Sequence, residues 1–304
     1  MINSNSYRSG RPNKHLKTRK RKAFKKLNCS PSKSALPESC YNTKQLLKIR
    51  NKWNMRHPER QITSDDSRVI WNMLRERLEY SCQNERCWLK NLFKNSDLDD
   101  DLLNYTFSPS KPISWDKNPN EWLSSDEIED VMNQYEKEHE NFEFIGPSPI
   151  DFDSIDKEDG DCVWPELCRF NVKKLLDKNK TKIGISLNLD PHNKPGSHWV
   201  TLFVDLKKGF IIYFDSNGDT PPKKVKALIS RIKKQYNEIM KMKNKTQRMK
   251  QFINKLEHQY KNTECGMYSL HFMIELIKDK DFKIFLKKRI PDEEIFKLRN
   301  KYFN

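Results

Sequence analysis

Four residues of the types that catalyse acyl transfer follow one another along the chain: His198, Asp215, Gln259 and Cys265. A thiol, with an ordinary pKa of about 8.5, becomes a strong nucleophile when a helix N-terminus or an imidazolium lowers that pKa. The residues Glu264-Cys265-Gly266 begin a predicted helix, so the amides of its first turn should point towards the thiolate and towards an oxyanion beside it. The small Gly266 should leave room for a substrate. We therefore predict that Cys265 is the nucleophile.

The predicted general base is His198, and Asp215 is the predicted orienting group. They lie at the outer ends of two β-rich runs joined by a Lys207-Lys208-Gly209 turn, so antiparallel pairing brings them together. Asp215 would then accept a hydrogen bond from one ring nitrogen while the other faces Cys265, as in a serine-type triad.

Gln259 is a neutral donor shortly before Cys265. It is predicted to complete an oxyanion hole with the backbone amide at the start of the helix. Each of the four residues also has an ordinary structural interpretation: a cysteine can be a small buried apolar residue, and an aspartate after a strand can start a turn. The ordered combination of all four favours catalysis.

The elements that would position these residues include both helices and strands. Apolar spacing and N-cap residues predict helices at 42–53, 64–80, 120–139, 222–240 and 265–277. Strands are predicted at 182–189, 198–206 and 210–215. The predicted fold class is α+β: a mixed β-sheet flanked by helices, with the nucleophile at a helix N-terminus. A small helical region and a disordered basic arm precede it.

Composition divides the chain into three predicted parts. The formal net charge is +16, and the first 26 residues hold about ten lysines and arginines and no acid. Residues 1–41 are therefore predicted to be a disordered basic arm and linker. Residues 42–110 are predicted to form a helical N-terminal region, and residues 111–304 the catalytic domain.

The seven cysteines have no regular spacing. Free thiols and a reducing compartment are expected on this basis. A zinc site made of Cys82, Cys87, Cys162 and Cys168 is disfavoured because the spacings are loose and no histidine lies near either pair. No apolar run reaches eighteen residues, so no membrane association is expected.

Three segments resemble the cysteine proteases of the SUMO-protease and adenovirus-protease superfamily, especially the virion proteases of large nucleocytoplasmic DNA viruses. The segments are GSHWVTLFVDL (196–206), YFDSNG (213–218) and QYKNTECGMYSLHF (259–272), and the resemblance covers roughly residues 120–304. It implies His198 as base, Asp215 as orienter, Gln259 as oxyanion donor and Cys265 as nucleophile. It also implies a mixed sheet with the cysteine-bearing helix packed against it.

The same resemblance implies a substrate clamp. In SUMO-protease-like members two tryptophans hold a Gly-Gly tail in a narrow tunnel, and Trp199 and Trp122 look like that pair. Two flat indoles leave a slot that only glycine passes, so cleavage after Gly-Gly or another small pair is expected. The alternative is that Trp122 is a hydrophobic staple on its helix.

The predicted function is a viral cysteine endopeptidase that processes structural or core precursor proteins during virion assembly, with no metal or organic cofactor. The expected locations are the virion and the host cytoplasm. One alternative is an isopeptidase that removes SUMO or ubiquitin-like modifiers. Another is a basic nucleic-acid-binding core protein with a vestigial triad. Nucleic acid is also a candidate accessory partner of the basic arm, because clustered lysine and arginine attract phosphates.

Overall fold

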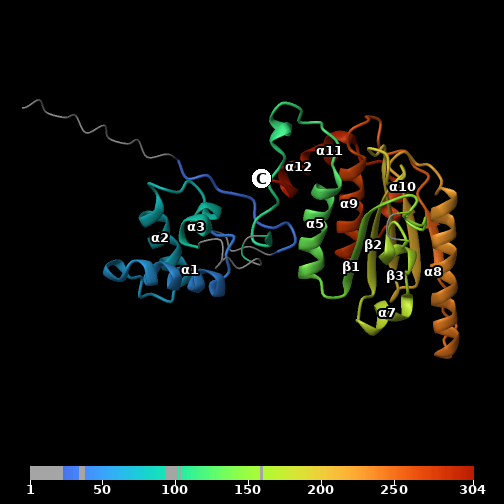
Figure 1. Ribbon diagram of the computed structural model, residues 1–304, viewed down its shortest axis with the longest axis horizontal. Coiled ribbons are helices and arrows are strands. Elements are labelled where there is room, and N and C mark those ends of the chain that lie inside the picture. The colour runs from blue at the N-terminus through green and yellow to red at the C-terminus, as the bar shows by residue number, and fades with distance from the viewer. Residues whose placement is uncertain (1–22, 34–37, 94–101, 103, 158–159) are drawn as a thin grey trace, which may run out of the picture.

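The chain folds into a helical N-terminal part and a larger part built on one β-sheet (Figure 1). The computed structural model describes residues 23–33, 38–93, 102, 104–157 and 160–304. In these ranges no helix is long and apolar enough to cross a membrane.

The sheet has five strands in the order β1-β2-β3-β4-β5. They are β1 (Phe142–Pro149), β2 (Lys182–Asn188), β3 (Trp199–Asp205), β4 (Phe210–Phe214) and β5 (Lys250–Ile253). The three central strands pair antiparallel, whereas β1 pairs parallel with β2 and β5 pairs parallel with β4. The predicted hairpin is confirmed as β3 and β4, and the expected α+β class with a mixed sheet is confirmed as well.

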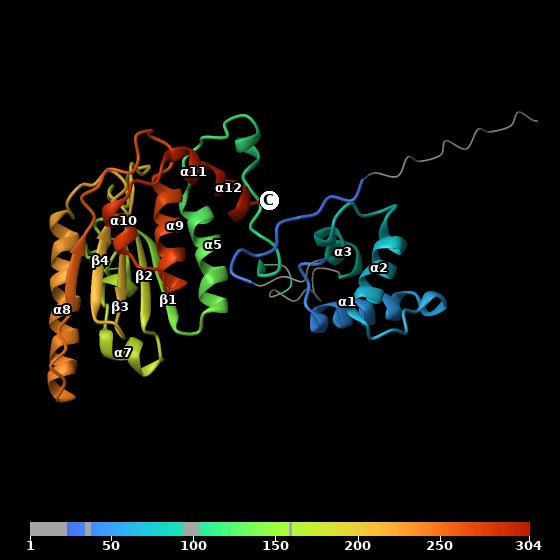
Figure 2. The same cartoon turned by 180° about the vertical axis from the view of Figure 1, so that it is seen from behind.

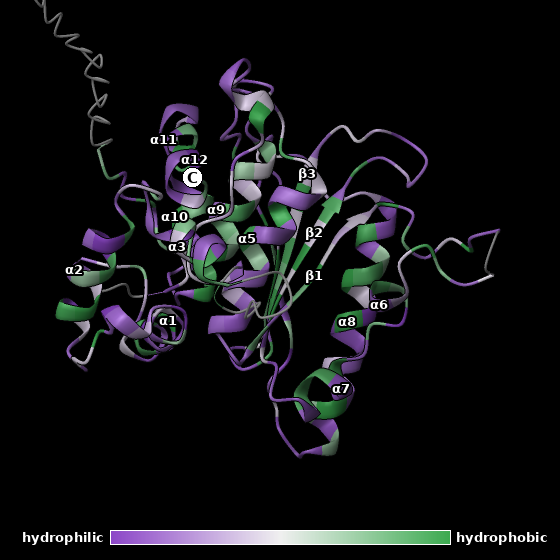
Figure 3. Cartoon of the chain, turned by 60° about the vertical axis from the view of Figure 1, so that its left-hand side comes forward, coloured by the Kyte–Doolittle hydropathy of each residue, from purple (hydrophilic) through white to green (hydrophobic). Residues whose placement is uncertain are grey.

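Helices cover both faces of the sheet, as Figures 1 and 2 show. Helices α5 (Ser125–Glu138) and α9 (Cys265–Ile277) pack on one face, and α7 (Val172–Asp177) and α8 (Lys223–Met242) pack on the other. Alternate residues of β3 serve the two layers: Phe203 faces α9, while Leu202 and Val204 face α8. In Figure 3 the central strands are accordingly hydrophobic and the outer loops hydrophilic.

Short elements complete this part of the molecule. They are η2 (Ile113–Asp116), α6 (Pro165–Cys168), α10 (Lys283–Lys287), α11 (Asp292–Lys297) and α12 (Arg299–Tyr302). The helix predicted at 120–139 is α5, and it begins later, with a capping box: the Ser124 side chain accepts from the backbone of Asp126, and the Glu127 side chain accepts from the Ser124 amide.

The N-terminal part contains α1 (Thr43–Arg56), the short η1 (Pro58–Arg60), α2 (Ser67–Leu78) and α3 (Glu85–Leu92). Its core is a separate cluster centred on the buried Trp88 and Tyr41. Gln134 of α5 connects the two parts, because it accepts a hydrogen bond from Ser30 at 2.7 Å and donates to the Phe107 carbonyl at 2.9 Å.

The expectation that residues 1–41 are disordered needs correction. Residues 1–22 and 34–37 lie outside the described residues, but 23–33 and 38–41 are packed. Cys29 forms a β-bridge with Phe107, and Tyr41 is fully buried. Basic and proline-rich composition predicted a solvated linker here, whereas scattered apolar and polar contacts hold the segment against the helical part.

The expectation of free thiols is also corrected. The described residues include all seven cysteines, and six of them form the disulfides Cys29–Cys40, Cys82–Cys87 and Cys162–Cys168, which leaves Cys265 free. The cysteines that were considered as zinc ligands are thus two separate disulfides. Sequence separations of 11, 5 and 6 residues let each pair meet within a local turn, which irregular spacing along the whole chain does not reveal.

Candidate active site

Three predicted site residues meet at one end of the central strands β3 and β4. Because β3 and β4 are antiparallel, His198, which precedes β3, lies next to Asp215, which follows β4. The Nε2 atom of His198 is 2.7 Å from Oδ1 of Asp215. Cys265, the first residue of α9, is the second hydrogen-bond partner of the imidazole, which leaves Nδ1 to face the thiol.

The protonation of His198 is controlled by these two partners. Burial alone would lower its pKa, but the hydrogen bonds to Asp215 and to Cys265 and their charges outweigh burial and raise the pKa of His198 to about 10. An imidazolium at neutral pH is the partner that a thiolate nucleophile needs.

Asp215 is buried within a network that the sequence did not reveal. Its Oδ1 also accepts from the Asn217 amide at 2.9 Å, and its Oδ2 accepts from the Tyr213 hydroxyl at 3.3 Å. Burial and the charge of Asp215 raise the pKa of Tyr213, so its hydroxyl stays protonated and donates. The side chain of Asn254 donates to the Asp215 carbonyl at 2.8 Å. The contacts of Tyr213 and Asn217 hold the carboxylate towards His198, and the contact of Asn254 fixes the backbone of Asp215. None of these three residues was predicted as a site residue.

Gln259 is held in place by Ser216. The Ser216 hydroxyl donates to Gln259 Oε1 at 2.8 Å, and the Ser216 carbonyl accepts from the Gln259 amide at 3.0 Å. With its oxygen engaged, the side chain has its NH₂ group left to donate, as an oxyanion donor must.

His258, directly before Gln259, has a structural role. Its Nδ1 accepts from the Ile290 amide at 3.1 Å, so Nε2 carries the proton that is donated to the Phe285 carbonyl at 2.8 Å. Burial lowers the pKa of His258 and keeps it neutral. The ring thereby fixes the loop that carries Gln259.

The nucleophile position is almost closed to solvent. Cys265 is 3% exposed and lies at the N-terminus of α9. Within the described residues, the side chain of the N-cap residue, Glu264, caps none of the first-turn amides. These amides therefore remain available beside the sulfur for an anionic oxygen.

The structure gives a different reason for a glycine at position 266 from the one predicted. A Cβ atom at this position would lie 2.9 Å from the Leu123 Cβ, so the space beside Gly266 holds Leu123 rather than substrate. The Leu123 carbonyl in turn accepts from Nε1 of Trp199 at 2.9 Å. The segment before α5 is thereby pressed against the helix that carries Cys265.

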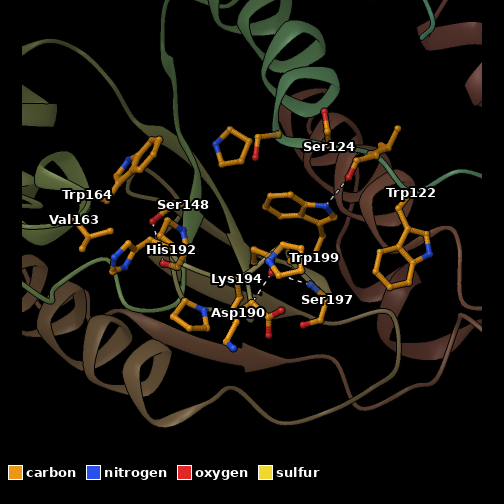
Figure 4. Close-up of a pocket in the computed structure, with 18 of the residues that line it drawn as sticks. Trp122, Ser124, Ser148, Val163, Trp164, Asp190, His192, Lys194, Ser197 and Trp199 are labelled. Carbon is orange, nitrogen blue, oxygen red and sulfur yellow. Dashed lines mark hydrogen bonds between the residues drawn. The ribbon is translucent and has the colours of Figure 1, made fainter. Parts of the chain in front are cut away.

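A groove of about 580 Å³ is shown in Figure 4; the residues on either side of His198, Ser197 and Trp199, line it, but none of the four predicted catalytic residues does. Both predicted clamp residues line it: Trp199 is 7% exposed, and Trp122 is 47% exposed. The hydrophobic-staple alternative applies to Leu123 instead, because Leu123 directly precedes the N-cap and shares a buried cluster with Ile128. The opposite wall is formed by Trp164 and by the loop that follows β2.

In the part of the chain that the structure describes, no group of three or more His, Cys, Asp and Glu side chains is arranged to hold a metal ion. Catalysis without a metal or an organic cofactor therefore stays a prediction.

Comparisons with known proteins agree with this geometry. The model of the Ulp1 protease family, C-terminal catalytic domain, matches residues 169–304. A thiol protease of Acanthamoeba polyphaga mimivirus is 29% identical over 284 residues, which cover 87% of this chain and 89% of the mimivirus protein. A cysteine protease of African swine fever virus is 28% identical over 188 residues, or 60% of this chain and 67% of that protein.

The fold is also that of a solved viral protease. The crystal structure of the African swine fever virus pS273R protease superposes with a TM-score of 0.61 at 21% sequence identity and covers 91% of this chain and 95% of the viral one. The resemblance inferred from the three sequence segments is confirmed. The chain is therefore a cysteine protease, and its residues 169–304 match the C-terminal catalytic domain of the Ulp1 protease family.

Proposed function

We propose that the chain is an endopeptidase in which Cys265 attacks the peptide carbonyl. His198 transfers the proton to the leaving amine and then activates the water that releases the acyl-enzyme, while Asp215 orients the imidazole. Gln259 and the first-turn amides of α9 bind the oxyanion. The observation that carries this proposal is the contact of one imidazole with both the buried Asp215 and the only free thiol among the described residues.

The groove supports cleavage after a small residue pair such as Gly-Gly. Trp199 is held by its hydrogen bond to the Leu123 carbonyl, and Trp122 is the residue just before Leu123, so one segment positions both indoles. A backbone without side chains fits between two flat rings at the smallest cost in space.

The proposed substrates are structural or core precursor proteins, cut during virion assembly in the host cytoplasm and within the virion. The support is that both relatives described above are proteases of viruses. Binding of nucleic acid by the basic arm stays a prediction, since residues 1–22 lie outside the described residues.

A second candidate is removal of SUMO or ubiquitin-like modifiers. One observation favours it: a protein of African swine fever virus named SUMO-1 cysteine protease is 32% identical to this chain over 132 residues, or 43% of the chain. The cleavage chemistry would be the same, and only the recognised protein would differ.

The test is to incubate the full chain with a candidate core precursor and with a ubiquitin-like protein that carries a C-terminal extension, and to follow both by intact mass. Wild-type protein should cut the precursor after a small pair, and Cys265→Ala and His198→Gln should not. His57→Gln is the matched control, because His57 stacks on Trp53 in the N-terminal part. Cleavage of the ubiquitin-like fusion alone would favour the second candidate, and cleavage by Cys265→Ala would refute the proposed nucleophile.

A further inference from the structure

A buried ion pair lies directly beside the nucleophile. Nε of Arg299 in α12 is 3.0 Å from Oε2 of Glu264, and its Nη2 is 3.2 Å from Oε1. The side chains of Arg299 and Glu264 are only 4% and 2% exposed. Both carboxylate oxygens of the residue before Cys265 are therefore engaged by one guanidinium.

Arg299 also reaches the wall of the groove. Its Nη2 donates to the Glu121 carbonyl at 2.8 Å, next to Trp122, and its guanidinium lies 4.5 Å from the centre of the Trp115 ring. The guanidinium thus connects the start of α9 with the segment that carries one clamp tryptophan.

The position of Glu264 makes this contact important for the reaction. A carboxylate beside a helix N-terminus is attracted to the amides of the first turn, because this end of a helix is electropositive. In this protein those amides flank Cys265, so a carboxylate bound to them would occupy the place of the oxyanion and would oppose ionisation of the thiol. Glu264 instead turns its carboxylate to Arg299 and makes no such cap.

We propose that Arg299 is a positioning residue that holds the Glu264 carboxylate away from the first-turn amides of α9 and so keeps them free for the oxyanion. This inference rests on the proposed function of Cys265 as nucleophile. It assigns the last helix of the chain a part in catalysis without contact with the substrate.

Other charged or titratable groups face this region without replacing Arg299. Lys261 interacts electrostatically with Glu264, but its ammonium pairs with Glu293 at 2.9 Å. The Tyr268 hydroxyl donates to the Ile290 carbonyl at 2.8 Å. His198 faces Cys265 rather than Glu264.

The test measures how fast iodoacetamide alkylates Cys265 at each pH, in the full chain with its disulfides intact. Arg299→Met should raise the pH midpoint of alkylation by about one unit, because it leaves an unpaired carboxylate one residue from the thiol. It should also lower kcat by roughly tenfold to a hundredfold at nearly unchanged KM, since a blocked oxyanion donor acts on the transition state.

The double variant Glu264→Gln/Arg299→Met separates positioning from structural support. It removes the carboxylate together with its partner, so the midpoint should return to the wild-type value. Lys301→Met is the matched control, because Lys301 is an exposed cation of the same helix. If Arg299→Met does not fold, Arg299→Gln should raise the midpoint in the same direction by less, because its amide can still hold the carboxylate but no longer neutralises its charge.

The outcomes keep the two proposals apart. If wild-type Cys265 reacts only near the ordinary thiol pKa of about 8.5, the proposed function fails. If the wild type reacts at lower pH and a folded Arg299 variant shows the same midpoint, the inference alone is overturned. A double variant that stays as impaired as Arg299→Met would likewise reduce Arg299 to a structural support.

Discussion

At the scale of single residues, His198 couples the stability of the protein to pH. Its pKa in the folded protein, about 10, lies above the ordinary value of 6.5, because hydrogen bonds to Asp215 and Cys265 outweigh burial. A group whose pKa rises on folding stabilises the folded state most below its unfolded pKa. The stabilisation from His198 is therefore complete below about pH 6.5 and is lost as the pH rises to about 10.

We expect Asp215→Asn to remove much of this stabilisation. The free energy of unfolding, measured in urea between pH 6 and pH 10, should differ most between wild type and variant at the acidic end. The difference should shrink as the pH approaches 10, because His198 then loses its proton in the wild type as well. A difference that is constant or grows with pH would show that Asp215 does not hold the imidazolium.

Residue types and order were enough to identify His198, Asp215, Gln259 and Cys265 as candidates, because their chemistry is visible in the sequence. The residues that hold them were harder to find. The Ser216 hydroxyl and the Asn254 amide act only through the folding of distant loops, and neither side chain is of a type that signals catalysis.

At the scale of elements, the contact between α9 and the segment before α5 shapes the site. Gly266→Ala would place a methyl group 2.9 Å from the Leu123 Cβ. We expect a loss of about 1–3 kcal/mol in the free energy of unfolding from overpacking, with a fall in kcat/KM as Trp122 and Trp199 shift.

The double variant Gly266→Ala/Leu123→Ala provides the control, since it removes the side chain that the new methyl group meets. It should be more stable than the sum of the two single changes predicts. Chemical denaturation of all four proteins measures this coupling, and strict additivity would mean that the two side chains do not compete for the same space.

Elements with strong local signals were predicted, and those without were not. Residues close together in the sequence determine the β3–β4 hairpin, the capping box of α5 and the apolar face of α9. Strand β1 contains two prolines, and β5 is a short edge strand with exposed residues, so neither has the alternation of a typical strand. Each becomes a strand by pairing with a neighbouring strand that lies far along the chain, Phe142 with Lys182 and Lys250 with Phe210.

At the scale of the whole molecule, the disulfides change the expected number of free thiols. We predict that iodoacetamide in denaturant will add one label per chain without reduction, at Cys265, and seven labels after reduction. Cys265→Ala should take up no label without reduction. Seven labels without reduction, from protein purified in the absence of reductant, would restore the prediction of free thiols.

Helix α8 separates the active site from an exposed turn. It starts near the end of strands β3 and β4 where His198 and Asp215 meet, and its 20 residues span about 30 Å towards the other end of these strands, where residue 250 pairs with Phe210 (Figure 2). The exposed turn at 243–248 is therefore remote from the groove. A fluorophore or a surface anchor attached there should leave the groove open. This turn is therefore a suitable attachment site for immobilising the protease while the groove stays accessible to large protein substrates.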